Sequence, residues 1–193
     1  TYLYFEEMKI DPKNPKSPDR DRFVLSKGHC APALYSVMAQ RGYFPVEELT
    51  TLRKLGSRLQ GHPSMNYLPG IDMSSGSLGQ GISAACGMAL SAKLDHKDFR
   101  VYTLLGDGEI EEGQVWEASM FAGFRKLDNL VVIVDNNGLQ IDGPVDKVNS
   151  PYPIDKKFEA FNFHVIRIEA DDFDQIRSAL AEARNTKGMP TAI

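Results

Sequence analysis

Two short apolar segments, residues 101–105 and 130–134, enclose a segment of helical length and constrain the fold more than any other feature of the chain. Residues 113–126, between them, carry a helical pattern. Two strands joined by a helix form a βαβ unit whose strands run parallel. Parallel sheets are covered by helices on both faces. The sequence therefore predicts an α/β fold with a parallel sheet flanked by helices on both faces.

Each of these predicted strands ends in a small polar cluster. Asp107 stands between Gly106 and Gly108 after the first strand, and Asn137 follows the second. Ligands of parallel sheets bind at the carboxyl ends of the strands. A carboxylate and an amide oxygen suit Mg²⁺, with phosphates and water completing its shell. Asp-Gly and Asn-Gly are also ordinary turn formers, but two such clusters at equivalent strand ends favour a diphosphate–metal site.

Five motifs in a fixed order carry a resemblance to a known family. Gly106-Asp107-Gly108, then 27 residues, then Asn136-Asn137 resembles the motif that thiamine-diphosphate enzymes share. The surrounding stretches narrow the resemblance to the transketolase family: residues 25–35 (LSKGHCAPALY), 59–64 (LQGHPS), 74–83 (SSGSLGQGIS) and 139–143 (LQIDG). The similarity runs essentially from end to end. It is greatest to the amino-terminal, diphosphate-binding subunit of a split transketolase.

The resemblance implies a set of site residues. The cofactor is thiamine diphosphate with Mg²⁺, or else Ca²⁺ or Mn²⁺. The metal ligands implied are Asp107, Asn137 and the Leu139 carbonyl. The implied cofactor-binding residues are His29, Gly76, Leu78, Gly106, Asp107, Gly108, Glu109, Asn137 and Ile141. The implied catalytic residues are His29, which lies at the diphosphate, and His62, which faces the thiazolium ring and the donor substrate. The resemblance also implies that Glu112 and Glu117 lie at a dimer interface.

Two of these stretches can also be interpreted as purely structural features. His29 lies at a loop-to-helix junction, where an imidazole can meet a phosphate, yet a lone histidine is more often structural. Residues 76–81 form a glycine-rich loop before an alanine-rich helix, which is either an anion cradle or only a tight turn. The resemblance favours the functional reading of His29. It places Gly76 and Leu78 against the aminopyrimidine ring rather than on phosphate.

The implied activity is the transfer of a two-carbon ketol unit from a ketose or its phosphate to an aldose or its phosphate. One alternative is another thiamine-dependent carboligase, such as a 1-deoxyxylulose-phosphate synthase relative. A second, of a different class, is a non-catalytic protein that binds thiamine diphosphate. Retention of His62 argues against the second, because diphosphate binding alone does not require it.

The resemblance also implies a partner. Residues 1–193 correspond to one diphosphate-binding (PP-type) domain, which we expect to be truncated at both ends. Thiamine catalysis needs a glutamate that transketolases carry in the pyrimidine-binding domain, and this chain lacks that domain. We therefore expect a separate carboxy-terminal subunit, self-association, and an α₂β₂ assembly that acts on sugar substrates.

Net charge, hydrophobicity and cysteine content limit the classes of partner and of cellular compartment that fit this chain. The net charge of −4 gives no reason to expect nucleic acid or an anionic membrane as a partner. No apolar stretch approaches the roughly 20 residues of a membrane span. Cys30 and Cys86 lack metal-ligand spacing. They are expected to be free thiols in a reducing cytoplasm.

Local patterns predict the remaining elements. Breaker residues indicate an exposed loop at 11–22. The first residues indicate a helix and the last four the start of a strand. The predicted helices are 32–41, 46–54, 79–94 and 171–187, and the further predicted strands are 23–26 and 163–169.

Overall fold

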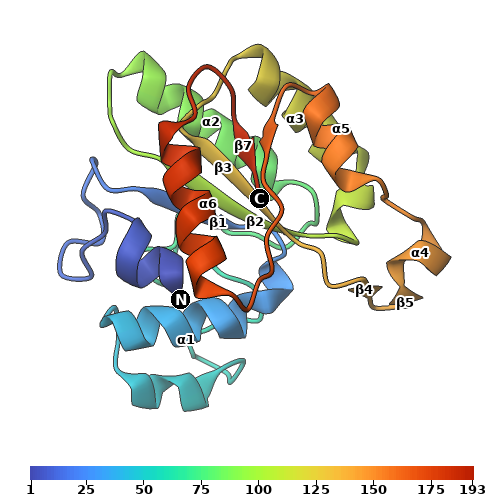
Figure 1. The fold of residues 1–193 in the computed structure, drawn as a ribbon. Helices are drawn as coiled ribbons and strands as arrows, with labels where there is room; N and C mark the ends of the chain where they lie inside the picture. The colour runs from blue at the N-terminus through green and yellow to red at the C-terminus, as the bar shows by residue number, and fades with distance from the viewer.

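The centre of the computed structural model, which describes residues 1–193, is a five-stranded sheet in the order β1-β2-β3-β7-β6 with every neighbouring pair parallel (Figure 1). Its strands are β1 (Arg22–Leu25), β2 (Val101–Gly106), β3 (Leu130–Asp135), β6 (His164–Val165) and β7 (Thr191–Ala192). The short strands β4 (Leu139–Gln140) and β5 (Gly143–Pro144) form a separate antiparallel hairpin. The α-helices are α1 (Ala31–Arg41), α2 (Gly81–Leu94), α3 (Gly113–Phe124), α4 (Val145–Val148), α5 (Ile154–Ala160) and α6 (Phe173–Asn185). Four short helical turns are η1 (Leu3–Glu7), η2 (Gly28–Cys30), η3 (Val46–Thr51) and η4 (Glu109–Glu111).

Alternation along the strands divides the apolar residues between two cores. In β1, Val24 belongs to one core, whereas Phe23 and Leu25 belong to the other, because successive side chains point to opposite faces. Helices α2, α3 and α5 cover the first core, and α1, α6 and η1 cover the second. Figure 1 shows α6 in front of the sheet and α2 behind it. The predicted α/β fold with helices on both faces is confirmed.

The helix predicted at 46–54 is confirmed only in its first part. The segment is a 3₁₀ helix that ends at Thr51. The hydroxyl of Thr50 donates to the Glu47 carbonyl (2.9 Å), and that of Thr51 donates to the Glu48 carbonyl (2.8 Å). Such side-chain bonds compete with the backbone bonds that would continue a helix.

The strand predicted at 163–169 is too long. Only His164 and Val165 pair as strand residues, opposite Thr191 and Ala192 of β7. The other helices predicted from the sequence are confirmed with ends shifted by at most two residues, and the first residues form a single π-helical turn, η1.

Close packing of α2 on β1 sets the distance between two of the segments predicted to form the site. A Cβ atom added to Gly81 would lie 2.5 Å from Ser26 Cβ and 2.6 Å from Ser26 Cα. Only glycine allows this approach. The amino end of α2 is therefore fixed directly against the carboxyl end of β1.

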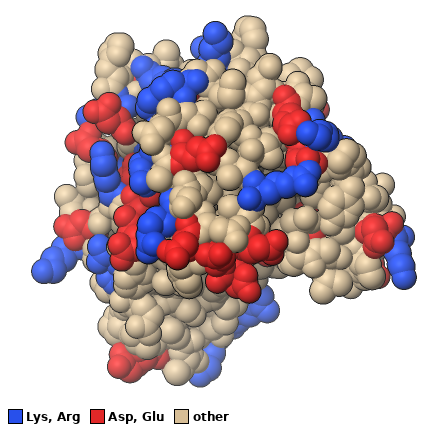
Figure 2. All heavy atoms as spheres, in the orientation of Figure 1, with Lys and Arg blue, Asp and Glu red and all other residues tan.

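The face of the molecule drawn in Figure 2 carries side chains of both charges. Figure 2 shows acidic and basic side chains interspersed over one face. None of the helices combines the length and hydropathy that a membrane crossing requires.

Candidate functional site

The register between β2 and β3 brings the two predicted polar clusters together. Gly106, the last residue of β2, pairs with Asp135, the last residue of β3. Asp107 and Asn137 therefore leave neighbouring strands at the same edge of the sheet. This is the carboxyl edge, where parallel sheets bind ligands.

The Asp107 carboxylate is held in one orientation by two backbone groups. It is 1% exposed, and its Oδ1 accepts from Gly108 N (2.8 Å) while its Oδ2 accepts from Gly138 N (2.6 Å). Each oxygen retains a further lone pair for a ligand. Asn137 is exposed, and its Oδ1 accepts from Leu139 N (2.9 Å). The other two predicted metal ligands, Asn137 and Leu139, thus lie on one continuous turn beside the Asp107 carboxylate.

A third strand end contributes a cation that the sequence motifs did not indicate. Lys27 follows β1, its side chain is 9% exposed, and its Nζ pairs with the Asp135 carboxylate. Its stem passes Gly106, where an added Cβ would lie 3.5 Å from Lys27 Cδ. Asp135 also accepts from Asn137 Nδ2 (3.2 Å). The available signal was the position of Lys27 directly after a predicted strand, which places a positive charge at the same sheet edge.

The β4–β5 hairpin is anchored to the strand ends, while its apolar side chains remain uncovered. Gln140 Nε2 donates to Glu111 Oε1 (3.0 Å), and a Cβ added to Gly108 would lie 2.9 Å from Gln140 Cβ. Leu139 is 63% exposed and Ile141 is fully exposed. Figure 1 shows the hairpin and α4 projecting from the body of the molecule. The predicted cofactor contact Ile141 is thus free to pack against another molecule.

Tyr152, which the sequence analysis did not single out, lies at the same edge. Its hydroxyl donates to Asn136 Oδ1 (2.8 Å). Partial burial raises the pKa of Tyr152, and the nearby Asp107 and Asp146 carboxylates raise it further. The phenol therefore stays protonated and able to donate at neutral pH.

The two predicted catalytic histidines lie exposed at the rim of the site. His29 stands in η2, directly after β1 and Lys27. The His62 ring faces the glycine-rich loop, since a Cβ added to Gly76 would lie 3.8 Å from it. The Tyr35 hydroxyl fixes the His62 segment by donating to the backbone carbonyl of His62 (3.3 Å).

Ser75 marks the contact between the His29 and Gly76 loops. Its hydroxyl is buried and has no hydrogen-bond partner. It lies 2.8 Å from the position of a Cβ on Gly28. A buried hydroxyl without a partner is costly. Leu78, a predicted ring contact, is half-buried two residues beyond Gly76.

Glu109 is turned into the protein. It is 3% exposed, its Oε1 accepts from Gly79 N (2.9 Å) and the Ser26 hydroxyl, and its Oε2 accepts from Gly106 N (3.0 Å). The carboxylate thus bonds to three segments of the chain rather than extending from the surface toward a ligand.

Glu112 and Glu117, the predicted interface acids, are both exposed. Glu112 immediately precedes α3, and Glu117 lies on its outer face. Three apolar side chains of α3 are also exposed: Met120 (60%), Phe121 (40%) and Phe124 (77%). This outer face of α3 is apolar, with an acidic group at its amino-terminal end.

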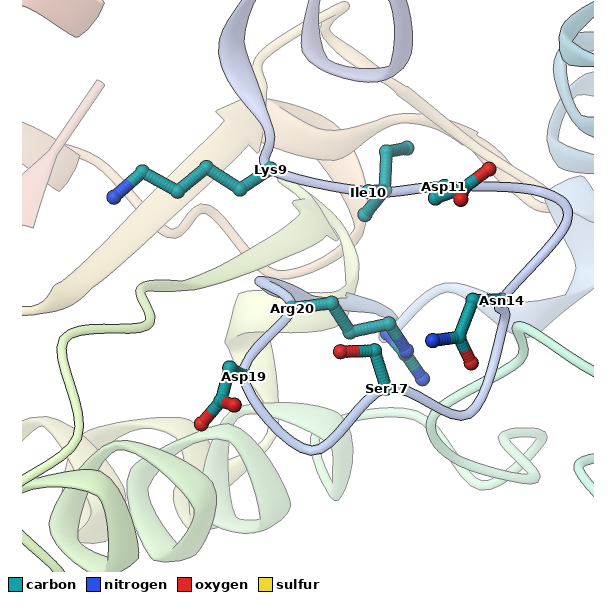
Figure 3. Close-up of a pocket in the computed structure, with 7 residues that line it drawn as sticks. All are labelled: Lys9, Ile10, Asp11, Asn14, Ser17, Asp19 and Arg20. Atoms are coloured by element: carbon teal, nitrogen blue, oxygen red, sulfur yellow. The ribbon is translucent and has the colours of Figure 1, made fainter.

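A pocket of about 420 Å³ lies elsewhere, along the loop between η1 and β1 (Figure 3). None of the predicted site residues lines it. The guanidinium of Arg20, which points into it in Figure 3, is bonded to the Pro15 and Asp21 carbonyls and to the Asp72 carboxylate. The N–H groups of the Arg20 guanidinium therefore stabilise the loop between η1 and β1.

The sheet order and the helices on both faces define an α/β domain whose polar groups converge at the carboxyl edge. Residues 1–193 match a family model described as transketolase, thiamine diphosphate binding domain. The chain belongs to the transketolase family.

Individual relatives support this assignment. The chain is 51% identical to the 6-deoxy-6-sulfo-D-fructose transketolase subunit SqwG of Clostridium sp. (strain MSTE9), over 99% of this chain and 70% of that protein. It is 45% identical to rat (Rattus norvegicus) transketolase over 99% of this chain, but spans only 30% of that protein. The structure of Leishmania mexicana transketolase matches with a TM-score of 0.94 and 37% identity, covering 100% of this chain and 30% of that one. These matches favour transketolase over the 1-deoxyxylulose-phosphate synthase alternative.

Proposed function

We propose that this chain holds the diphosphate and Mg²⁺ of a transketolase that moves a two-carbon ketol unit from a ketose to an aldose. The observation that carries the proposal is the convergence of Asp107, Asn137 and Lys27 at three adjacent strand ends. Family membership supplies the identity of the cofactor, thiamine diphosphate.

The residues present fit this cofactor and a divalent cation. Asp107 offers an oriented anionic oxygen, while Asn137 and the Leu139 carbonyl offer neutral oxygens, which is a donor set that Mg²⁺ prefers. The exposed side chain of Ile141 offers apolar surface to a ring.

When bound, thiamine diphosphate supplies the carbon nucleophile that takes up the two-carbon unit. The chain supplies position and charge. Gly106 and Gly108 let the backbone approach the diphosphate closely, and Lys27 places a positive charge beside it. His29 binds at the diphosphate end. His62 moves protons at the substrate hydroxyls, because an imidazole exchanges protons readily near neutral pH.

We infer that turnover needs a second chain, which carries the glutamate of the pyrimidine-binding domain, with residues 1–193 forming one diphosphate-binding domain. The relative SqwG supports this inference, because it is named a subunit and this chain spans 70% of it. That relative is named for a sulfonated ketose, so ketoses with a sulfonate or a phosphate are the substrates we propose to test. The two free cysteines support a reducing cytoplasm as the compartment.

We also infer self-association through the outer face of α3. The exposed Phe121 and Phe124 support it, since contiguous apolar surface marks interaction sites. Phe124→Glu is expected to shift the chain toward monomer in sedimentation velocity. An unchanged sedimentation coefficient would exclude this face.

The decisive experiment is a calorimetric titration of thiamine diphosphate into the chain with and without Mg²⁺. We expect Mg²⁺-dependent binding that Asp107→Asn weakens by roughly 100-fold, because a metal-site carboxylate is lost. Asp98→Asn, an exposed acid that precedes β2 at its amino end, is the matched control and should bind normally. Equal affinity for the two variants would mean that the Asp107 and Asn137 clusters are only turns.

A second experiment separates an enzyme from a binding protein. With the organism's carboxy-terminal transketolase chain added, ketol transfer from a phosphorylated or sulfonated ketose is measured for the wild type and for His62→Ala. Loss of turnover with unchanged cofactor affinity supports the enzyme. Absence of turnover from the wild-type pair with every ketose tested, despite tight cofactor binding, contradicts it.

A further inference from the structure

Glu109 is a buried carboxylate whose hydrogen bonds all go to neutral groups. Its donors are the Ser26 hydroxyl, Gly79 N and Gly106 N, and no basic side chain forms an ion pair with it. Burial of a charge is costly unless it is compensated. Three convergent donors compensate it here, and they come from parts of the chain that are distant in sequence.

Each donor lies next to a segment assigned to the cofactor. Ser26 directly precedes Lys27 and the His29 loop, Gly79 directly follows Leu78, and Gly106 directly precedes Asp107. We propose that Glu109 is a positioning residue that fixes the spacing between the ring-binding loop and the diphosphate-binding strand ends. The identity of the ligand in this inference rests on the proposed function. Glu109, predicted from the sequence as a cofactor contact, thus acts through these loops.

The packing around these donors allows little adjustment. Gly79 has a φ of +81°, which favours glycine, and an added Cβ would lie 2.8 Å from Glu112 Cβ. Gly81 is in contact with Ser26, as described above. A shift of one segment is therefore passed to the others. The hydrogen bonds to Glu109 stabilise one arrangement of the three segments that carry Ser26, Gly79 and Gly106.

Glu109→Gln tests the proposal with little change of shape. An amide has one acceptor oxygen and one donor nitrogen. Whichever way it is turned, the N–H of either Gly79 or Gly106 then faces an NH₂ group and loses its acceptor. Glu109→Ala removes the acceptors of both. Ser26→Ala is a milder variant that keeps the carboxylate and both glycine bonds.

The matched control is Glu7→Gln. The Glu7 side chain is 1% exposed, accepts from the Tyr102 hydroxyl (2.7 Å) and pairs with Arg184. Tyr102 is near the amino end of β2, whereas Gly106 is at its carboxyl end. This control shows how much stability is lost when a buried carboxylate away from the site is replaced by a neutral amide.

Two measurements are made on the full chain. Amide hydrogen exchange by NMR, without cofactor, is expected to accelerate at one of the two glycines in Glu109→Gln and at both in Glu109→Ala. Calorimetry at saturating Mg²⁺ is expected to show thiamine diphosphate binding weakened roughly tenfold in Glu109→Gln, in keeping with the loss of one buried hydrogen bond. Ser26→Ala should show a smaller loss, and Glu7→Gln none.

The proposal is overturned if Glu109→Gln lowers the melting temperature but leaves glycine exchange and cofactor affinity equal to those of Glu7→Gln. Glu109 would then be only a structural carboxylate. If Glu109→Ala does not fold, Glu109→Gln and Ser26→Ala still decide. Failure of the wild type to bind the cofactor, both alone and with the partner chain added, would refute the proposed function. The exchange data would show separately whether Glu109 ties the loops together.

Discussion

Replacement of Gly81 by alanine tests the contact on which the site is built. The added Cβ would lie 2.5 Å from Ser26 Cβ and 2.6 Å from Ser26 Cα. Ordinary carbon–carbon contacts lie at roughly 3.5–4.0 Å. One of these neighbours is backbone, so a side-chain rotation cannot relieve the clash. The amino end of α2 must move away from β1 by about 1 Å.

The cost follows from the packing. Overpacking of this kind costs about 1–3 kcal/mol. Alanine returns less than about 1 kcal/mol of helix propensity, because residue 81 is in the first turn. The free energy of unfolding should therefore fall by about 2 kcal/mol. For a chain of this size, that lowers Tm by roughly 4–8 °C.

Gly87→Ala, in the same helix, is the matched control. No atom lies within 4 Å of its added Cβ, so it should gain about 0.5–1 kcal/mol from helix propensity alone. Thermal unfolding followed by far-UV circular dichroism should then move in opposite directions for the two variants. If Gly81→Ala melts at or above the wild-type temperature, α2 does not approach β1 as described.

Three further outcomes are expected. Burial raises the pKa of the Cys86 thiol to about 12. Iodoacetamide at about pH 8 should therefore label Cys86 only after the chain is unfolded, which mass spectrometry detects. Labelling of Cys86 in the folded chain would contradict its burial. Hydrogen bonds from the Gln175 side chain and backbone hold the pKa of Asp172 below its usual value. The stability contributed by the Asp172 carboxylate is therefore present above the unfolded pKa of about 4 and lost as the pH falls through the folded value. Asp172→Ala should lower Tm most at neutral pH, and the difference from the wild type should shrink in acid. A pH-independent difference would refute this reasoning. Lys27→Met should weaken thiamine diphosphate binding roughly tenfold, because it removes a charged partner of the diphosphate. An unchanged affinity for thiamine diphosphate would contradict this role of Lys27.

Much of the fold was predictable because its signals are local. The β-branched runs that became β2 and β3 and the periodic pattern of α6 are confirmed. The placement of Asp107 and Asn137 on one sheet edge also followed, since the ends of parallel neighbours must meet. The residues of α4 and α5 were not predicted. These helices have only four and seven residues, too few for a clear period.

Other features depended on distant residues and could not be predicted. Glu109 lies 83 positions from Ser26 and 30 from Gly79, so its inward orientation is decided by tertiary packing. The pairing of Lys27 with Asp135 spans 108 positions. A local pattern shows that a charged residue follows a strand, but it does not show which group that residue reaches.

The position of β7 has a consequence for the order in which the chain folds. Strand β6 joins the sheet only through β7, and Ile193 both donates to Val132 O and accepts from Val134 N (2.9 Å each). During synthesis, β6 and α6 leave the ribosome before the strand that connects them to β3. The pairings of β7 with β3 join residues about 60 positions apart, and such pairings form slowly because a long loop must close before the contacts stabilise it. Until then the edge of β3 is open and can pair with a strand of another chain.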